Sequence, residues 1–219
     1  MKIGIVCYPT FGGSGVLATE LGIELSKKGY EIHFITYNQP VKLELLSNKV
    51  HYHEVMVPDY PLFHYQPYEL ALSTKVVDMV KKHEIELLHV HYAIPHAYAA
   101  YMAKNMLKYE GINIPVVTTL HGTDITLVGS HPSYKAAVEF SINKSDAVTA
   151  VSESLKRDTE ELFSIDTNIE VIPNFINLEK YPLERKEKTR SIIAENDEKI
   201  ICHISNFRKV KRIDDVINI

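Results

Sequence analysis

Residues 2–15 read Lys2-Ile-Gly-Ile-Val-Cys-Tyr8 followed by Pro9-Thr-Phe-Gly-Gly-Ser-Gly15. The first segment is a nearly continuous apolar run, which is typical of a buried parallel strand. A helix-forming stretch then begins at Val16. A glycine-rich turn between a strand and a helix brings backbone N–H groups close to a ligand, and the helix dipole adds to their attraction for anions. The junction therefore predicts a binding site for phosphate or carboxylate at residues 12–15.

The glycine spacing narrows the kind of site. The turn reads Gly12-Gly-Ser-Gly15, and the sequence contains neither G-x-G-x-x-G at this place nor G-x-x-x-x-G-K-[ST] anywhere. This spacing disfavours an NAD-dependent oxidoreductase and a P-loop nucleotide site. A tight turn without a ligand is the alternative that this segment leaves open.

Strands and helices are predicted to alternate along most of the chain. This alternation favours a doubly wound parallel sheet with right-handed crossovers, which is an α/β fold. The predicted strands are residues 2–8, 31–37, 50–57, 85–90, 114–120, 147–151 and 169–172. The predicted helices are residues 16–28, 68–83, 95–109, 133–143 (with Ser133 as N-cap) and 153–163 (with Ser152 as N-cap).

The pattern changes near the C-terminus. Residues 178–198 are highly charged and poor in apolar side chains, whereas residues 199–204 resemble a new buried strand, and a helix is predicted to begin at Ile213. One strand and part of a helix cannot bury a core of their own. We therefore predict an N-terminal domain at residues 1–176, a linker at 177–198, and the opening β-α unit of a truncated second domain at 199–219.

Composition excludes several classes of protein. The net charge is −4, which gives no general attraction for nucleic acid, and no run approaches the ~20 apolar residues that span a bilayer. The N-terminus lacks the pattern of a signal peptide. Cys7 and Cys202 both lie in apolar runs, so both are predicted to be buried thiols in a reducing, cytoplasmic protein. A homo-oligomer is compatible with the sequence.

Polar residues at the predicted strand ends are the candidates for chemistry, because ligands gather at the carboxyl ends of parallel strands. The sharpest candidate is His121-Gly-Thr-Asp124, which follows an apolar strand directly. A histidine there can donate a hydrogen bond to a ligand or transfer a proton near neutral pH. The alternative is a histidine bonded to the local backbone, with Asp124 capping the next turn.

Two further clusters have more than one interpretation. His89-x-His91 and His51-x-His53 each place two imidazoles on one face of a strand, but the sequence shows no Cys-x-x-Cys or His-Glu-x-x-His, so a metal site is disfavoured. Arg208-Lys-Val-Lys-Arg212 lies between a predicted strand and a predicted helix. It suits a phosphate clamp better than a nucleic-acid patch, and a solvated surface run is the third interpretation.

Four motifs resemble the N-terminal part of the retaining glycosyltransferases of family 4, which have the GT-B fold. They are Cys7-Tyr-Pro-Thr-Phe-Gly-Gly-Ser-Gly15, His89-Val-His-Tyr-Ala-Ile-Pro-His96, Thr118-Thr-Leu-His-Gly-Thr-Asp-Ile125 and Ile204-Ser-Asn-Phe-Arg-Lys-Val-Lys-Arg212. The resemblance covers the whole chain. It implies two Rossmann-like domains, of which the N-terminal one binds the acceptor and the C-terminal one most of the donor.

The resemblance also implies roles for particular residues. Lys211 corresponds to the family lysine that neutralises the donor diphosphate, whereas Asn206 stands where the family usually has arginine, so Arg208 is expected to supply that charge. His121 is implied beside the transferring sugar. The implied catalytic residues are His121, Lys211 and Arg208; the donor-diphosphate residues are Gly13, Gly15, Asn206, Arg208 and Lys211; and the acceptor residues are Ser14, Tyr92, Thr119 and Thr123.

Within the family, the motifs look closest to members that transfer N-acetylglucosamine from UDP-N-acetylglucosamine to L-malate, the first step of bacillithiol biosynthesis. These two small molecules are the implied partners, and neither a metal nor another cofactor is expected. We expect the chain alone to lack transferase activity. A family 4 transferase with another acceptor, and a non-enzymatic α/β module that binds an anion, are the alternatives.

Overall fold

The computed structural model describes residues 1–43, 48–180, 187–195, 197–205 and 209–218. They form two compact units, Met1–Phe175 and Ile176–Ile219. The predicted Rossmann-like α/β fold is confirmed for the first unit, where the described residues build a seven-stranded, entirely parallel sheet of order β3-β2-β1-β4-β5-β6-β7. The strands are β1 (Lys2–Val6), β2 (Glu31–Thr36), β3 (Val50–Glu54), β4 (Leu87–His91), β5 (Val116–Leu120), β6 (Ala147–Ala150) and β7 (Ile169–Val171).

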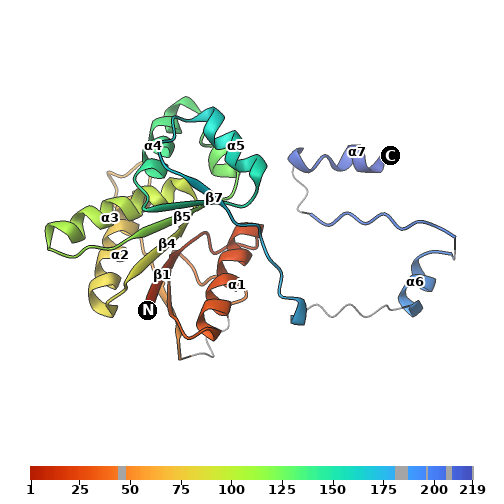
Figure 1. The fold of residues 1–219 in the computed structure, drawn as a ribbon, viewed down its shortest axis with the longest axis horizontal. Coiled ribbons are helices and arrows are strands. Elements are labelled where there is room, and N and C mark those ends of the chain that lie inside the picture. The colour runs from red at the N-terminus through yellow and green to blue at the C-terminus, as the bar shows by residue number, and fades with distance from the viewer. Residues whose placement is uncertain (44–47, 181–186, 196, 206–208, 219) are drawn as a thin grey trace. The chain divides into compact units, whose positions relative to one another are not determined.

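Helices cover both faces of this sheet (Figure 1). They are α1 (Gly13–Lys27), α2 (Tyr68–His83), α3 (Tyr98–Tyr109), α4 (Pro132–Asn143) and α5 (Glu153–Leu162), with the short helical segments η1 (Ala93–Ala97) and η2 (Thr123–Leu127). Alternate residues of each strand point to opposite faces. Ile5, Ile32 and Phe34 therefore pack in the cluster that contains Ala18 of α1, whereas Ile35 belongs to the cluster beneath α2 and α3.

The helix boundaries correct two predictions and confirm a third. Helix α1 begins at Gly13, three residues before the predicted Val16, because the glycines adopt helical backbone geometry despite their low propensity. In α4, His131 rather than Ser133 is the N-cap: its Nδ1 accepts from the Ser133 N–H at 3.2 Å, and Pro132 occupies the first helical position. Ser152 caps α5 as predicted, since its hydroxyl accepts from the Leu155 N–H.

The second unit contains short helical segments. They are η3 (Leu178–Lys180), α6 (Glu187–Ile193), η4 (Lys209–Lys211) and α7 (Ile213–Ile217). The predicted strand at residues 199–204 is wrong: these residues form no strand, and the described residues of this unit offer no other strand with which to pair. Cys7 is buried as predicted, but Cys202 is exposed, because the apolar run around it packs in no core. Among the described residues, no helix is long and apolar enough to cross a membrane.

Candidate functional site

The carboxyl ends of three neighbouring strands assemble the predicted site. Strand β1 pairs with β4, and β4 pairs with β5, so the segments that follow these strands share one edge of the sheet. These segments carry the glycine junction, Tyr92 and His121 respectively. The expectation that these distant motifs converge is thus met in the fold, in the place where open α/β sheets bind ligands.

The glycine junction forms the first turn of α1. Gly12 is the N-cap in extended conformation, and Gly13 is exposed. The first N–H groups of a helix have no partner within it and lie at the positive end of its dipole. Gly15 is buried, and a Cβ atom there would overlap with the carbonyl oxygens of Tyr8 and Thr10. Glycine at this position therefore lets the loop fold tightly against the helix start.

Tyr92 joins the strand β4 to this turn. Its hydroxyl donates to the Ser14 hydroxyl at 2.6 Å, although the two residues are far apart in the sequence. The backbone of Tyr92 has a φ of +82°, an uncommon conformation for a bulky residue, and its N–H donates to the Thr119 carbonyl at 2.9 Å. The tyrosine ring also lies edge-on to Tyr8 and near His121, with centroid distances of 5.2 and 5.0 Å. A hydroxyl pair thus stands beside the helix N-terminus.

A row of stacked histidines adjoins the Tyr92–Ser14 hydroxyl pair, with His121 next to the Tyr92 ring. His91 Nδ1 and His121 Nε2 are 2.9 Å apart, and the rings of His89, His91 and His121 stack in succession. Burial, followed by the neighbouring His89 and His96, lowers the pKa of His121 to about 4. His121 is therefore neutral at pH 7, so its ring nitrogens are available for hydrogen bonds rather than for ion pairs.

Asp124 holds two of the site loops together. Its side chain is buried, and its carboxylate accepts from the backbone N–H groups of Ala93, His121 and Gly122 at 2.9, 3.2 and 3.0 Å. Burial raises its pKa to about 6, while these backbone hydrogen bonds act in the opposite direction. The sequence placed Asp124 in the candidate motif His121-Gly-Thr-Asp124, with a cap for the next turn as the alternative interpretation. Its bond to Ala93 depends on the packing of η1 against η2, which no local pattern shows.

The remaining predicted residues occupy different environments. The Thr119 hydroxyl is buried between His89 Nε2 and the Thr149 hydroxyl, at 2.8 Å from each. Thr123 is exposed at the start of η2, and Lys211 is exposed in η4 of the second unit. Asn206 and Arg208 lie outside the described residues, so their predicted roles remain predictions.

Comparisons with solved structures show which fold the chain has. A glycosyltransferase from Rickettsia africae matches with a TM-score of 0.66 and 21% identity, over 89% of this chain and 50% of that one. Anabaena HepE, solved in complex with UDP-glucose, matches with a TM-score of 0.59 and 17% identity, over 83% of this chain and 46% of that one. These likenesses show the fold, which is that of GT-B glycosyltransferases.

Sequence comparison makes the assignment more specific. The model of Glycosyltransferase Family 4 matches residues 11–180, so the chain belongs to this family and is a glycosyltransferase domain. It is similar to the N-acetyl-alpha-D-glucosaminyl L-malate synthase of Bacillus anthracis, with 48% identity over 218 residues, or 99% of this chain. The chain spans only 56% of the length of that relative.

Proposed function

We propose that this protein transfers N-acetylglucosamine from UDP-N-acetylglucosamine to the hydroxyl of L-malate, with retention at the anomeric carbon, as the first step of bacillithiol biosynthesis. The observation that carries the proposal is the 48% identity to the Bacillus anthracis malate synthase, which extends over 99% of the chain. The site supports it, because the carboxyl edge of the sheet combines a helix N-terminus, a hydroxyl pair and a neutral histidine.

The acceptor is assigned to the hydroxyl pair. A malate carboxylate would accept hydrogen bonds from the N–H groups of the first turn of α1 and from Ser14, which the Tyr92 hydroxyl orients. His121, held by His91 and by the Asp124 loop, would then donate to the sugar or to the acceptor hydroxyl. Thr123 and Thr119 complete the proposed acceptor set, Thr123 from the exposed rim and Thr119 from beneath.

The donor diphosphate is assigned to the other side of the same turn. Negative charge grows on this leaving group during transfer, and the N–H groups at Gly13 and Gly15 would stabilise it as preorganised dipoles. The family resemblance implies that Lys211, Arg208 and Asn206 also bind the diphosphate, and we propose that the reaction uses neither a metal nor another cofactor. A front-face reaction, in which the leaving phosphate takes the acceptor proton, accounts for retention without a carboxylate nucleophile.

An NMR titration of the isotope-labelled chain tests the acceptor assignment. L-Malate should give saturable shifts at Ser14, Tyr92 and the first turn of α1, whereas inositol phosphate should give none. Ser14→Ala and Tyr92→Phe should each weaken malate binding about fivefold to tenfold, because each removes one hydrogen bond of about 1 kcal/mol. Tyr109→Phe is the matched control, since Tyr109 is 95% exposed on α3. Saturable inositol phosphate binding without malate binding would assign the chain to another acceptor.

A second experiment tests whether the site is catalytic. In a protein of the full length of the relatives, His121→Ala should reduce kcat for sugar transfer strongly while leaving the fold intact. Unchanged transfer by this variant would refute the role of His121. It would favour a site that only binds an anion.

A further inference from the structure

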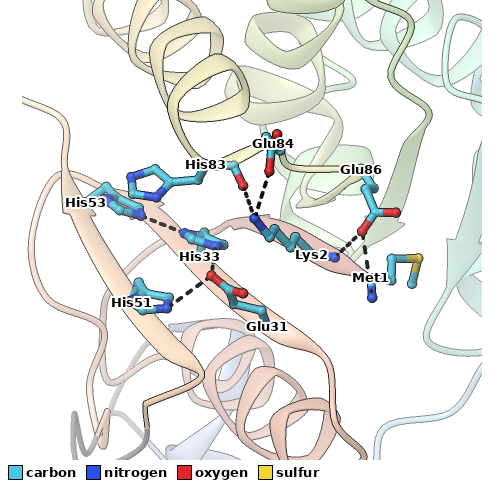
Figure 2. A network of polar contacts seen from close by, with 9 residues as sticks. All are labelled: Met1, Lys2, Glu31, His33, His51, His53, His83, Glu84 and Glu86. Carbon is cyan, nitrogen blue, oxygen red and sulfur yellow. Dashed lines mark hydrogen bonds and ion pairs between the residues drawn. The ribbon is translucent and has the colours of Figure 1, made fainter.

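A second cluster of titratable side chains lies on β2, β3 and the C-terminus of α2, away from the site at the carboxyl ends of β1, β4 and β5 (Figure 2). Glu31 and His33 come from the start of β2, and His51 and His53 come from β3, which pairs with β2 in parallel register. His83 is the last residue of α2. The cluster is therefore built from three elements, and none of its members belongs to the carboxyl-edge site.

The hydrogen bonds within the cluster fix the state of His33. Its Nε2 lies 3.1 Å from Glu31 Oε1, and its Nδ1 lies 2.9 Å from His53 Nε2. A carboxylate only accepts hydrogen bonds, so the proton of neutral His33 sits on Nε2. The Nδ1 atom then presents a lone pair toward His53 and His83.

We propose that His33, His53 and His83 bind a divalent transition metal, with Zn²⁺ as the preferred ion. One ligand atom from each of the three imidazoles lies within 4.8 Å of the other two. A tetrahedral Zn²⁺ site with bonds of 2.0–2.1 Å needs nitrogens about 3.3 Å apart. His83 is only partly buried at the end of its helix, so rotation of its side chain can close the remaining gap. Water would take the fourth position.

Glu31 strengthens this assignment. Histidines that bind a metal usually donate their second ring N–H to a carboxylate, which orients the ring and makes it a better ligand. The Glu31–His33 bond supplies this arrangement before any metal binds. Glu31 also contributes negative charge, which opposes the positive charge of Lys75 near His53 and of Lys82 near His83. The Lys2 ammonium donates to the His83 carbonyl at 2.9 Å and pairs with Glu84 at 3.3 Å (Figure 2).

A neighbouring set of ligands, Glu31, His33 and His51, is also compact enough to hold an ion. It would use His33 Nε2, the atom whose proton Glu31 accepts in the first arrangement. The set of three imidazoles is favoured because neutral nitrogen ligands suit Zn²⁺, and because it leaves the carboxylate bond intact. The metal would tie β2, β3 and the C-terminus of α2 together.

Calorimetric titration of the metal-free chain with Zn²⁺ tests the proposal. One ion should bind, and the melting temperature should rise with Zn²⁺ concentration. His53→Ala and His83→Ala should each abolish this binding, and Glu31→Gln should weaken it about 10–100-fold. His51→Ala and His64→Ala are the matched controls, since the first removes an adjacent imidazole that is not a ligand and the second an exposed histidine outside the cluster. Both should bind Zn²⁺ nearly as well as the parent chain.

The outcomes separate the alternatives. Absence of Zn²⁺ binding by the folded parent chain would overturn the proposal and leave a stack of neutral histidines. Loss of binding in His51→Ala, with binding retained in His83→Ala, would overturn the choice of ligands in favour of the neighbouring set. Far-ultraviolet circular dichroism shows whether each variant is folded. In a folded parent chain, Co²⁺ should give the strong visible absorption of a four-coordinate ion, and His83→Ala should lose it.

Discussion

Asp124 is the side chain on which the site loops depend most directly. Its two carboxylate oxygens accept hydrogen bonds from three backbone N–H groups, those of Ala93, His121 and Gly122. In Asp124→Asn, one oxygen becomes an NH₂ donor that faces a backbone donor. We expect this change to lower the free energy of unfolding by about 1–3 kcal/mol, which is the cost of leaving a buried polar group without a partner.

Urea unfolding at pH 7 measures this loss. Asp166→Asn is the matched control, because Asp166 is exposed and the same chemical change there should stay within about 0.5 kcal/mol of the parent. Equal stability of the Asp124→Asn and Asp166→Asn proteins would show that the three hydrogen bonds contribute nothing net.

His96 makes the stability depend on pH. It is completely buried, its Nδ1–H donates to the His91 carbonyl at 2.6 Å, and no partner is found for its Nε2 among the described residues. Burial lowers its pKa to about 4, against that hydrogen bond. The unfolded chain therefore binds a proton near pH 6.5 that the folded chain refuses until about pH 4. The contribution of His96 to the free energy of unfolding is fully present above pH 6.5. It is lost as the pH falls toward 4, by up to about 3 kcal/mol for this group alone.

Asp124 has the opposite effect over part of the same range. Its pKa is raised to about 6, so its contribution is complete below its unfolded pKa near 3.8 and is lost as the pH rises toward 6. Several buried histidines act like His96, so we expect a net loss of stability between pH 6.5 and 4. Urea unfolding at intervals of half a pH unit measures the slope. A flat profile would contradict the buried neutral state of these histidines.

Helix α1 offers a matched pair of glycines for a test of its first turn. A methyl group at Gly15 would overlap with the carbonyl oxygens of Tyr8 and Thr10, whereas a methyl group at Gly13 meets nothing within 4 Å. Gly15→Ala should therefore destabilise the protein by about 1–3 kcal/mol. Gly13→Ala should stabilise it by about 0.5–1 kcal/mol, because alanine loses less backbone entropy in a helix.

Thermal and urea unfolding of the two variants provide the measurement. The pair is informative because both changes add the same methyl group to the same helical turn. If both variants destabilise the chain equally, the close approach at Gly15 is not the reason for glycine in this turn.

The sequence predicted those elements whose signal is local. The apolar runs located the strands, and the rule for strand ends brought Tyr92, His121 and the glycine junction to one edge. The start of α1 was predicted too late, because helix propensity disfavours glycine, whereas the approach of the Tyr8 and Thr10 carbonyls requires glycine at position 15. The strand at residues 199–204 was wrong, because an apolar run forms a strand only beside a partner strand.

Contacts between elements that are distant in the chain could not be predicted from the sequence. His51 and His53 were noticed as a pair, but their approach to His33 depends on the register between β2 and β3, and that of His83 on how far α2 extends. The bond between Tyr92 and Ser14 also joins residues with no local relation, although the family resemblance implied both as acceptor residues. These two acceptor assignments came from the resemblance to the family, because the predicted strands alone do not show which side chains meet.

The division of the chain into two units governs the last prediction. The sheet and its three apolar clusters lie within residues 1–175, whereas the described part of residues 176–219 contains helical segments and no strand. The family resemblance implies that a second Rossmann-like domain binds most of the sugar nucleotide. We therefore expect the chain to bind L-malate but to release no UDP from UDP-N-acetylglucosamine, with or without malate. A shortened chain, residues 1–175, should unfold cooperatively at the same temperature and bind malate equally well, because it keeps the seven-stranded sheet and the whole proposed acceptor set. A coupled assay for UDP and a calorimetric melt measure these outcomes.

Malate-dependent UDP release by the chain would show that residues 1–219 suffice for transfer. A lower melting temperature of the shortened chain would show that residues 176–219 stabilise the sheet domain.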